Sequence, residues 1–424
     1  GLFTVFITLY NPIVDLIYNL IIGGFIMELN LDMIQTLALA IVAYYVGSWL
    51  KKKVSFLEKF CIPSPVVGGL IFSILTLILK EAGILTVSFD TTLQSPCMLV
   101  FFTSVGLTAN FQVIKKGGKL LIIFAILTAV LLTLQNVVGV GLAKVLGQNP
   151  LLGLMAGSIT MTGGHGTGGS WALVFEESYG ITGAMAITMA AATFGLVSGS
   201  LMGGPLGRKL ILKNGLKPAE ADIAAHENVA ADVADAKVSK ITLKSMFDTF
   251  GLMAVCMGLG TIIVNGLKNI GITMPSYIGA MIIACVIVNV AGKKLNVHPE
   301  CNDILGNMGL NVFLSMALIS LKLWELKAVA GPLLIILLAQ TLLMALFAYF
   351  VTFRLCGKNF DAAVLAAGHC GFGMGATPNA MANMDAVTSR FGPSPTAYLV
   401  IPIVGAFLVD FMNLAVITAF VNMV

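Results

Sequence analysis

The strongest constraint on the fold is a series of ten apolar runs, each near the roughly 20 residues that a helix needs to cross a bilayer. Gly, Pro and Ser occur freely within them, which is typical of membrane helices and not of barrel strands. Only 10% of the 424 residues are charged, against about a quarter in soluble domains. The sequence therefore predicts an all-α polytopic membrane protein. The runs cover residues 31–50, 62–80, 93–114, 119–146, 182–207, 242–266, 275–292, 303–321, 329–353 and 396–423.

The basic residues predict the orientation of these runs. Ten crossings, with the polar segments 150–176 and 359–387 returning to the side they leave, place nineteen of the 24 basic residues on one face. The positive-inside rule makes that face cytoplasmic. The net charge of +4 is then largely orientation charge, and it indicates no nucleic-acid partner. The other face receives Lys80, Lys144, Lys268, Lys322 and Lys327.

Matching motifs indicate that the chain is a duplication. Four pairs of residues, each in a similar local sequence, are 211 or 212 residues apart. Each half has five crossings, an odd number, so the second half is predicted to be inverted relative to the first. Inverted repeats with discontinuous helices are typical of secondary transporters, whose sites lie near the midplane. The pairs are Pro63 and Pro275, Ser104 and Ser315, Gly157 and Gly368, and Gly180 and Gly392.

The duplication predicts four parts of the chain. Residues 27–210 form the first five-helix repeat, 211–241 a polar cytoplasmic linker, and 242–424 the second, inverted repeat. Residues 1–26 are apolar but fit this plan badly, since they contain Asn, Pro and Asp and lack the basic start of a signal peptide. They are predicted to be an extra membrane helix, an interfacial helix, or a segment foreign to the ten-helix body.

The two polar segments are predicted to be re-entrant hairpins. One contains TMTGGHGTGGS, residues 160–170, and the other contains AAGHCGFGMGATPNA, residues 366–380. They occupy equivalent places in the inverted halves, so their glycine-rich tips are expected to approach each other from opposite faces. Bare backbone at membrane depth is tolerated where it is buried in protein or lines a cavity.

Such tips suit two kinds of ligand. Amides at the start of a half-helix attract a carboxylate, while unwound carbonyls and hydroxyls coordinate sodium. Thr160, Thr162, Thr167 and Thr377 supply hydroxyls, and Pro378 can begin a helix. The alternative is that the glycines only allow close helix packing. A phosphate loop is excluded by the lack of a GxxxxGK[ST] motif.

Polar residues elsewhere in the spans add further candidates. Asp410 and Asn413 share a helical face in the last span and offer oxygen ligands to sodium, or alternatively a contact between helices. His165 and His369 are 204 residues apart and so are not repeat mates; structural hydrogen bonding is favoured over proton coupling for both. Trp171 and Trp324 are predicted to be interfacial anchors.

Two mid-span pairs allow either packing or cavity lining. They are Gln135 with Asn136 and Gln340 with Thr341. The glycines at 195, 199 and 203, four residues apart, favour a close-packing face. Seven cysteines without CxxC spacing indicate neither a disulfide framework nor a metal site.

Several motifs together closely resemble the bacterial sodium/glutamate symporters. They are IPSPVVGGL, LMAGSITMTGGHGTGGSW, LMGGP, SLKLWEL, GKNFDAAVLAAGHCGFGMGATPNAMANM and RFGPSPTAYLVIPIVGAF, and the resemblance runs from about Met27 to the C-terminus. It implies an inner-membrane carrier that takes up glutamate with sodium, without another cofactor, as a homodimer working by an elevator-like movement. The candidate translocation site that it implies comprises Gly163, Gly164, His165, Gly166, Thr167, Gly168, Gly371, Gly373, Gly375, Ala376, Thr377 and Pro378.

Two other transport functions stay open on the residues alone. A sodium/proton antiporter needs a buried acid, which Asp410 provides, and a sodium-coupled hydroxycarboxylate carrier needs a basic residue near the tips. An enzyme is disfavoured because the sequence has no HExxH and no GxSxG motif.

Overall fold

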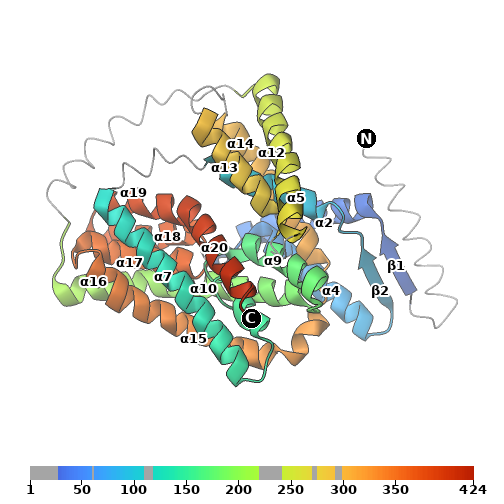
Figure 1. The fold of residues 1–424 in the computed structure, drawn as a ribbon. Coiled ribbons are helices and arrows are strands. Elements are labelled where there is room, and N and C mark those ends of the chain that lie inside the picture. Colours follow the sequence, from blue (N-terminus) through green and yellow to red (C-terminus); the bar gives the residue numbers. More distant parts are fainter. Residues whose placement is uncertain (1–26, 60–61, 109–117, 219–240, 270–274, 292–297) are drawn as a thin grey trace.

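The computed structural model describes residues 27–59, 62–108, 118–218, 241–269, 275–291 and 298–424. Residues 1–26, for which an extra helix is one prediction, lie outside the described residues, as does most of the predicted linker. The described part is mostly helical (Figure 1). Six of its helices are long and apolar enough to cross a membrane, and two shorter ones are also apolar, which supports a multi-pass membrane protein.

The helices follow the apolar runs closely, because each run is bounded by turn or polar residues. Helix α4 begins after Pro63, which fixes its backbone for a helix start, and α10 ends at Gly215, whose φ is 61°. In the first half the elements are α2 (Met33–Lys53), α3 (Ser55–Lys59), α4 (Ser64–Glu81), α5 (Gln94–Thr108), α7 (Gly118–Val145), α8 (Pro150–Met155), α9 (Gly164–Tyr179) and α10 (Ala184–Asn214).

The second half has the same order of long and broken helices. Its fourth span contains a π-helical stretch, η5, and its last span contains another, η6. The elements are α12 (Leu243–Asn269), α13 (Tyr277–Ala291), α14 (Pro299–Ile319), η4 (Leu323–Ala328), α15 (Ala330–Leu346), η5 (Phe347–Thr352), α16 (Phe353–Leu355), α17 (Phe360–Gly373), α18 (Thr377–Phe391), α19 (Pro395–Ile403), η6 (Val404–Leu408) and α20 (Val409–Val421).

A short parallel pair of strands departs from the all-α prediction. Strand β1 (Met27–Leu31) pairs with β2 (Leu85–Phe89), from Met27 opposite Leu85 to Leu31 opposite Phe89. Side chains along β1 alternate between half-buried and exposed, as strand residues do. A search for apolar runs of membrane length does not detect five-residue strands, and this part of the prediction was wrong. The predicted linker also begins late, since α10 continues to Asn214.

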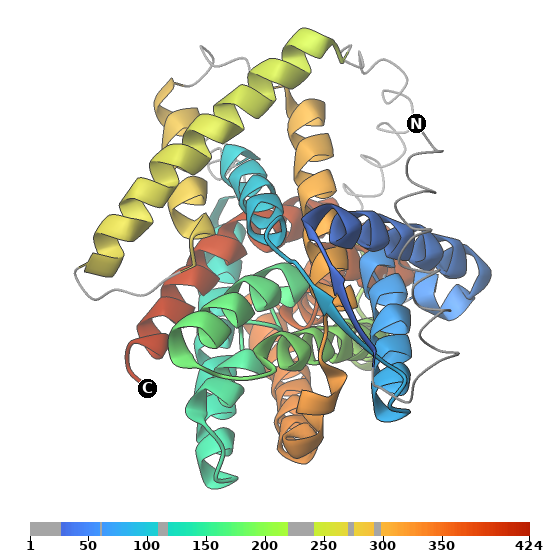
Figure 2. The same cartoon turned by 90° about the vertical axis from the view of Figure 1, so that its right-hand side faces the viewer.

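The helices pack in two groups that each draw on both halves of the chain. The first packing group comprises α2, α4, α5, α12, α13 and α14, with α5 against α13 and α14. The second comprises α7 to α10 and α15 to α20, with α10 against α9, α17 and α18, and α7 against α8, α15 and α20. Figure 1 has the first group towards the top and right and the second towards the lower left, and Figure 2 shows α12 crossing the top of the molecule. All four broken-segment helices therefore belong to one group.

Candidate functional site

Two breaks in the helices, one from each half, meet inside the second packing group. Residues 156–163 separate α8 from α9, and residues 374–376 separate α17 from α18. Gly164 has a φ of 62°, a left-handed conformation that residues with a side chain rarely adopt. A Cβ atom at Gly164 would lie 2.9 Å from the carbonyl oxygen of Gly375, so no side chain separates the two backbones. The structure thus brings the two glycine-rich segments together.

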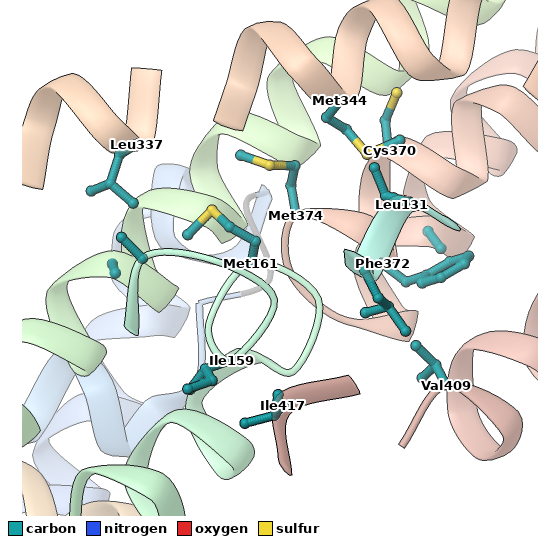
Figure 3. Close-up of a cluster of buried hydrophobic side chains, with 14 of the residues drawn as sticks. Leu131, Ile159, Met161, Leu337, Met344, Cys370, Phe372, Met374, Val409 and Ile417 are labelled. Atoms are coloured by element: carbon teal, nitrogen blue, oxygen red, sulfur yellow. The ribbon is translucent and has the colours of Figure 1, made fainter. Parts of the chain in front are cut away.

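Apolar side chains around the breaks form one buried cluster. Ile159 and Met161 come from the first break, and Phe372 and Met374 come from the end of α17 and the second break (Figure 3). Leu131 of α7 lies in the same cluster. The polar backbone of both breaks is therefore surrounded by a water-poor interior, where an unmet hydrogen bond is costly.

Gln135, in the middle of α7, joins the two breaks by hydrogen bonds. Its side-chain nitrogen donates to the carbonyl of Gly373 at 2.7 Å, and its side-chain oxygen accepts from the hydroxyl of Thr162 at 2.8 Å. Thr162 also lies 3.2 Å from the Gly373 carbonyl. Gln340 of α15 donates to the backbone carbonyl of Gln135 at 2.7 Å. Gln135 of α7 thus lies at both breaks, and Gln340 lies against it.

The first break is held by two asparagines at Ser158. The side-chain oxygen of Asn136 accepts from the Ser158 amide at 2.9 Å, and the side-chain nitrogen of Asn413 donates to the Ser158 carbonyl at 3.0 Å. All three residues are at most 2% exposed. Within the described residues, Asn136 Nδ2, Asn413 Oδ1 and Ser158 Oγ find no hydrogen-bond partner. Two oxygens and one amide nitrogen at this part of the break are therefore buried without a partner, which is costly unless a polar ligand meets them.

The breaks also leave two helix N-termini without side-chain caps. Helix α9 begins after Gly163 and α18 after Ala376, and neither residue has a side chain that can accept from the first amides. A helix N-terminus carries a partial positive charge and free amides. Since Gly164 and Gly375 approach closely, the two N-termini lie near the same place. This arrangement suits a carboxylate.

Three other residues were predicted to bind sodium, and two of them form hydrogen bonds through their hydroxyl groups. The Thr160 hydroxyl donates to the Met155 carbonyl at 2.6 Å, and the Thr377 hydroxyl donates to the Gly405 carbonyl of η6 at 2.8 Å. Both hydroxyl oxygens keep lone pairs. Asp410 lies one turn before Asn413 on α20 and makes no hydrogen bond or ion pair within the part of the chain described. The Asp410 carboxyl group lies near Tyr277 of α13.

Both histidines have hydrogen-bond partners on neighbouring helices. His165 Nε2 lies 3.0 Å from the Thr193 hydroxyl of α10, and His369 Nδ1 lies 2.9 Å from the Thr352 hydroxyl of η5. The His369 ring stacks on Phe372 with a centroid distance of 5.0 Å. These contacts agree with the structural role favoured from the sequence.

Comparison with known proteins identifies the family. Residues 29–393 match the family described as sodium/glutamate symporter. The chain belongs to the sodium/glutamate symporter family. A sodium/glutamate symporter of Escherichia coli (strain K12) is 45% identical over 393 residues, which cover 92% of this chain and 97% of the relative. One of Haemophilus influenzae is 43% identical over 387 residues, 90% of this chain and 95% of the relative. The resemblance inferred from the motifs is confirmed.

The chain also aligns with solved structures. A sodium proton antiporter from Methanocaldococcus jannaschii aligns with 93% of this chain and 98% of its own, at 14% identity and a TM-score of 0.43.

Packing explains several of the glycines in the family motifs. A Cβ atom on Gly371 would lie 2.4 Å from the backbone of Ala380 and would collide with it. A Cβ atom on Gly168 would lie 3.1 Å from the Thr160 methyl group, which is a tight contact. Gly195 and its two companions on α10 pack on α17 and α18, which confirms the predicted close-packing face. The packing alternative therefore holds for part of the motif, while Gly164 and Gly373 present backbone to the other break.

Three functional candidates in this symporter were missed from the sequence. Ser158 was one, and Asn379 and Asn383 of α18 were the others: Asn379 donates to Leu196 and Ser200 of α10, and Asn383 donates to the Gly199 carbonyl at 2.9 Å. The spacing of four residues between the asparagines, just after the second break, was the available signal. The interfacial prediction for Trp171 was wrong, since its side chain is fully buried on α9.

Proposed function

We propose that this protein takes up glutamate together with sodium across the cell inner membrane. Family membership supports the transport class and the substrate. The location of the proposed binding site rests on one observation: the uncapped N-termini of α9 and α18 lie close together. Two such helix ends offer backbone amides and a positive potential to a carboxylate. The site we propose consists of residues at the two breaks and at the adjoining helix ends. It comprises Thr162, Gly163, Gly164, His165, Gly166, Thr167, Gly168, Gly371, Gly373, Gly375, Ala376, Thr377 and Pro378.

Sodium is proposed to bind next to the first break. Asn413 Oδ1 and Ser158 Oγ are buried oxygens without a partner in the described chain, and sodium prefers oxygen ligands. Thr160 and Thr377 add hydroxyl oxygens, and Asp410 adds a negative charge one helical turn from Asn413. Since Asn413 also holds the Ser158 carbonyl, ion binding at this residue orders the break that begins α9.

The architecture we propose consists of two inverted five-helix repeats with re-entrant breaks. The shared order of helices in both halves supports it. In an elevator-like movement, the second packing group would shift against the first along α9. The contact there is between glycine and aromatic rings: a Cβ atom on Gly166 would lie 3.2 Å from the Phe101 ring, and one on Gly169 would lie 2.7 Å from the Phe313 ring. Assembly as a homodimer is part of the proposal, and cross-linking in native membranes tests it.

Uptake of labelled glutamate into proteoliposomes tests the function. Sodium, potassium and proton gradients are imposed separately, and only an inward sodium gradient is expected to drive accumulation. Proton flux driven by sodium without glutamate would indicate an antiporter instead, and accumulation of citrate or malate in place of glutamate would indicate a hydroxycarboxylate carrier. Coupling of glutamate transport to sodium requires that the protein with only one of the two ligands bound rarely changes conformation. Each ligand shifts the conformational equilibrium only by the difference in its affinity for the two conformations.

A further inference from the structure

A cavity of about 740 Å³ lies between the two packing groups, away from the helix breaks. Its wall is built by α4, β2 and the start of α5 from the first half, by η4, and by the Gly180–Gly183 loop that joins α9 to α10. It lies at the C-terminal end of α9, whereas the break lies at the N-terminal end of the same helix. The volume is within the range of about 300–1,000 Å³ that small-molecule sites have.

Four charged side chains line this cavity, and no ion pair forms between these four described residues. They are Lys80, Lys322, Glu176 and Glu325, and none of them forms an ion pair within the described chain. Lys80 Nζ lies 3.4 Å above the Trp324 ring. Glu176 accepts from the Met185 amide at 2.9 Å through one carboxylate oxygen, which leaves the other for a ligand. Glu325 lies against the Gly180–Gly183 loop, since a Cβ atom on Gly183 would be 3.0 Å from its carboxylate oxygen.

Gln94 provides an independent sign of a ligand. This residue begins α5, lines the cavity and is only 3% exposed. Its side-chain nitrogen has no hydrogen-bond partner within the described residues. A buried amide donor without an acceptor is costly unless a ligand or water accepts from it. The missing partner is an acceptor, such as a carboxylate oxygen.

We infer that this cavity is a second binding site for a dicarboxylic amino acid. Lys322, Lys80 and the Gln94 amide offer cations and a donor to two carboxylates, and Glu176 and Glu325 offer acceptors to an ammonium group. A neutral amino acid lacks the second carboxylate, and a dicarboxylate without nitrogen lacks the ammonium group. This inference rests on the proposed function, in which glutamate enters from outside the cell. Lys80 and Lys322 are on the face predicted to be outside, so glutamate reaches the cavity before it reaches the breaks.

The kinetic test uses a double variant with a matched control. Lys322→Gln with Gln94→Leu removes a charge and the unpaired donor, and it is expected to raise KM for glutamate about tenfold while leaving kcat unchanged. Lys144→Gln removes a charge from the same predicted face outside the cavity, and its KM should equal that of the wild type. An unchanged KM in the double variant overturns the inference.

Binding is measured separately from transport through Trp324, which lines the cavity. Glutamate is expected to change the tryptophan fluorescence of the purified full chain saturably, even without sodium, and glutamine and glutarate are expected to change it much less. Trp324→Phe and the double variant should lose the response. If the wild type binds in this way but does not transport glutamate, the proposed function fails and the cavity site stands. If it transports glutamate without this response, the cavity inference fails alone.

Discussion

Replacing Gln135 tests whether the bridge between the two breaks is part of the transport site. Gln135→Leu keeps the approximate volume of the side chain on α7 but removes its bonds to Gly373 and Thr162. Each bond contributes about 0.5–1.5 kcal/mol net, and a buried acceptor left alone costs about 1–3 kcal/mol. The Gly373 carbonyl keeps Thr162 as a donor at 3.2 Å, so the loss is at the lower end of the combined range, about 2–3 kcal/mol.

This loss is expected to appear as weaker substrate binding. We take the arrangement in which Gln135 connects the two breaks to be the one that binds glutamate. The substitution destabilises this arrangement by about 2–3 kcal/mol, so the apparent affinity for glutamate falls by about 30- to 150-fold. The assay is glutamate uptake at saturating sodium, together with thermal unfolding of the purified protein. Thr128→Val is the control on the same helix, since its buried hydroxyl bonds only to the Phe124 carbonyl one turn earlier. A glutamate affinity within twofold of wild type for Gln135→Leu would refute the reasoning.

Three further changes probe the same region. Asn413→Leu removes one proposed sodium ligand and is expected to raise the sodium concentration for half-maximal uptake about tenfold, with glutamate KM recovered at high sodium. Gly164→Ala forces a side chain into a left-handed conformation against the Gly375 carbonyl and should cost about 1–3 kcal/mol in thermal unfolding, whereas Gly141→Ala, which meets no neighbour, should not destabilise. Gly169→Leu, which lies outside the proposed site, wedges α9 against Phe313 of the first packing group and should abolish uptake while sodium-dependent glutamate binding persists.

The helices were predictable because a bilayer imposes one length and one composition on every span. The described parts of the ten apolar runs largely coincide with helices, and each of the two polar segments contains a break between helices. Gln135 and Gln340 could be selected as mid-span polar residues, but their partners could not. Which backbone carbonyl a glutamine meets depends on how α7 and α15 pack against breaks more than 20 residues away in the sequence.

Predictions based on the type of a single side chain were wrong where packing between helices determines its burial. Trp171 was assigned to an interface because indole rings favour that region, yet α9 lies within the second packing group and its tryptophan packs at 5.7 Å from the Phe175 ring. The β1–β2 pair was missed for a different reason. Five residues carry too little hydropathy signal, and their partner strand is more than 50 residues away.

The cluster at Ser158 links the ion to the substrate under the proposed function. Its two unpaired oxygens, Ser158 Oγ and Asn413 Oδ1, come from the first break and α20, so they gather only when the break is in its present arrangement. A cation that fills them therefore stabilises that arrangement by its own binding free energy. The same break positions Gly163 and Gly164 at the start of α9, where a carboxylate is proposed to bind. Each ligand then raises the affinity of the other by the same factor, since coupling between sites is reciprocal. Sodium dependence of glutamate binding and glutamate dependence of sodium binding should thus be equal in magnitude.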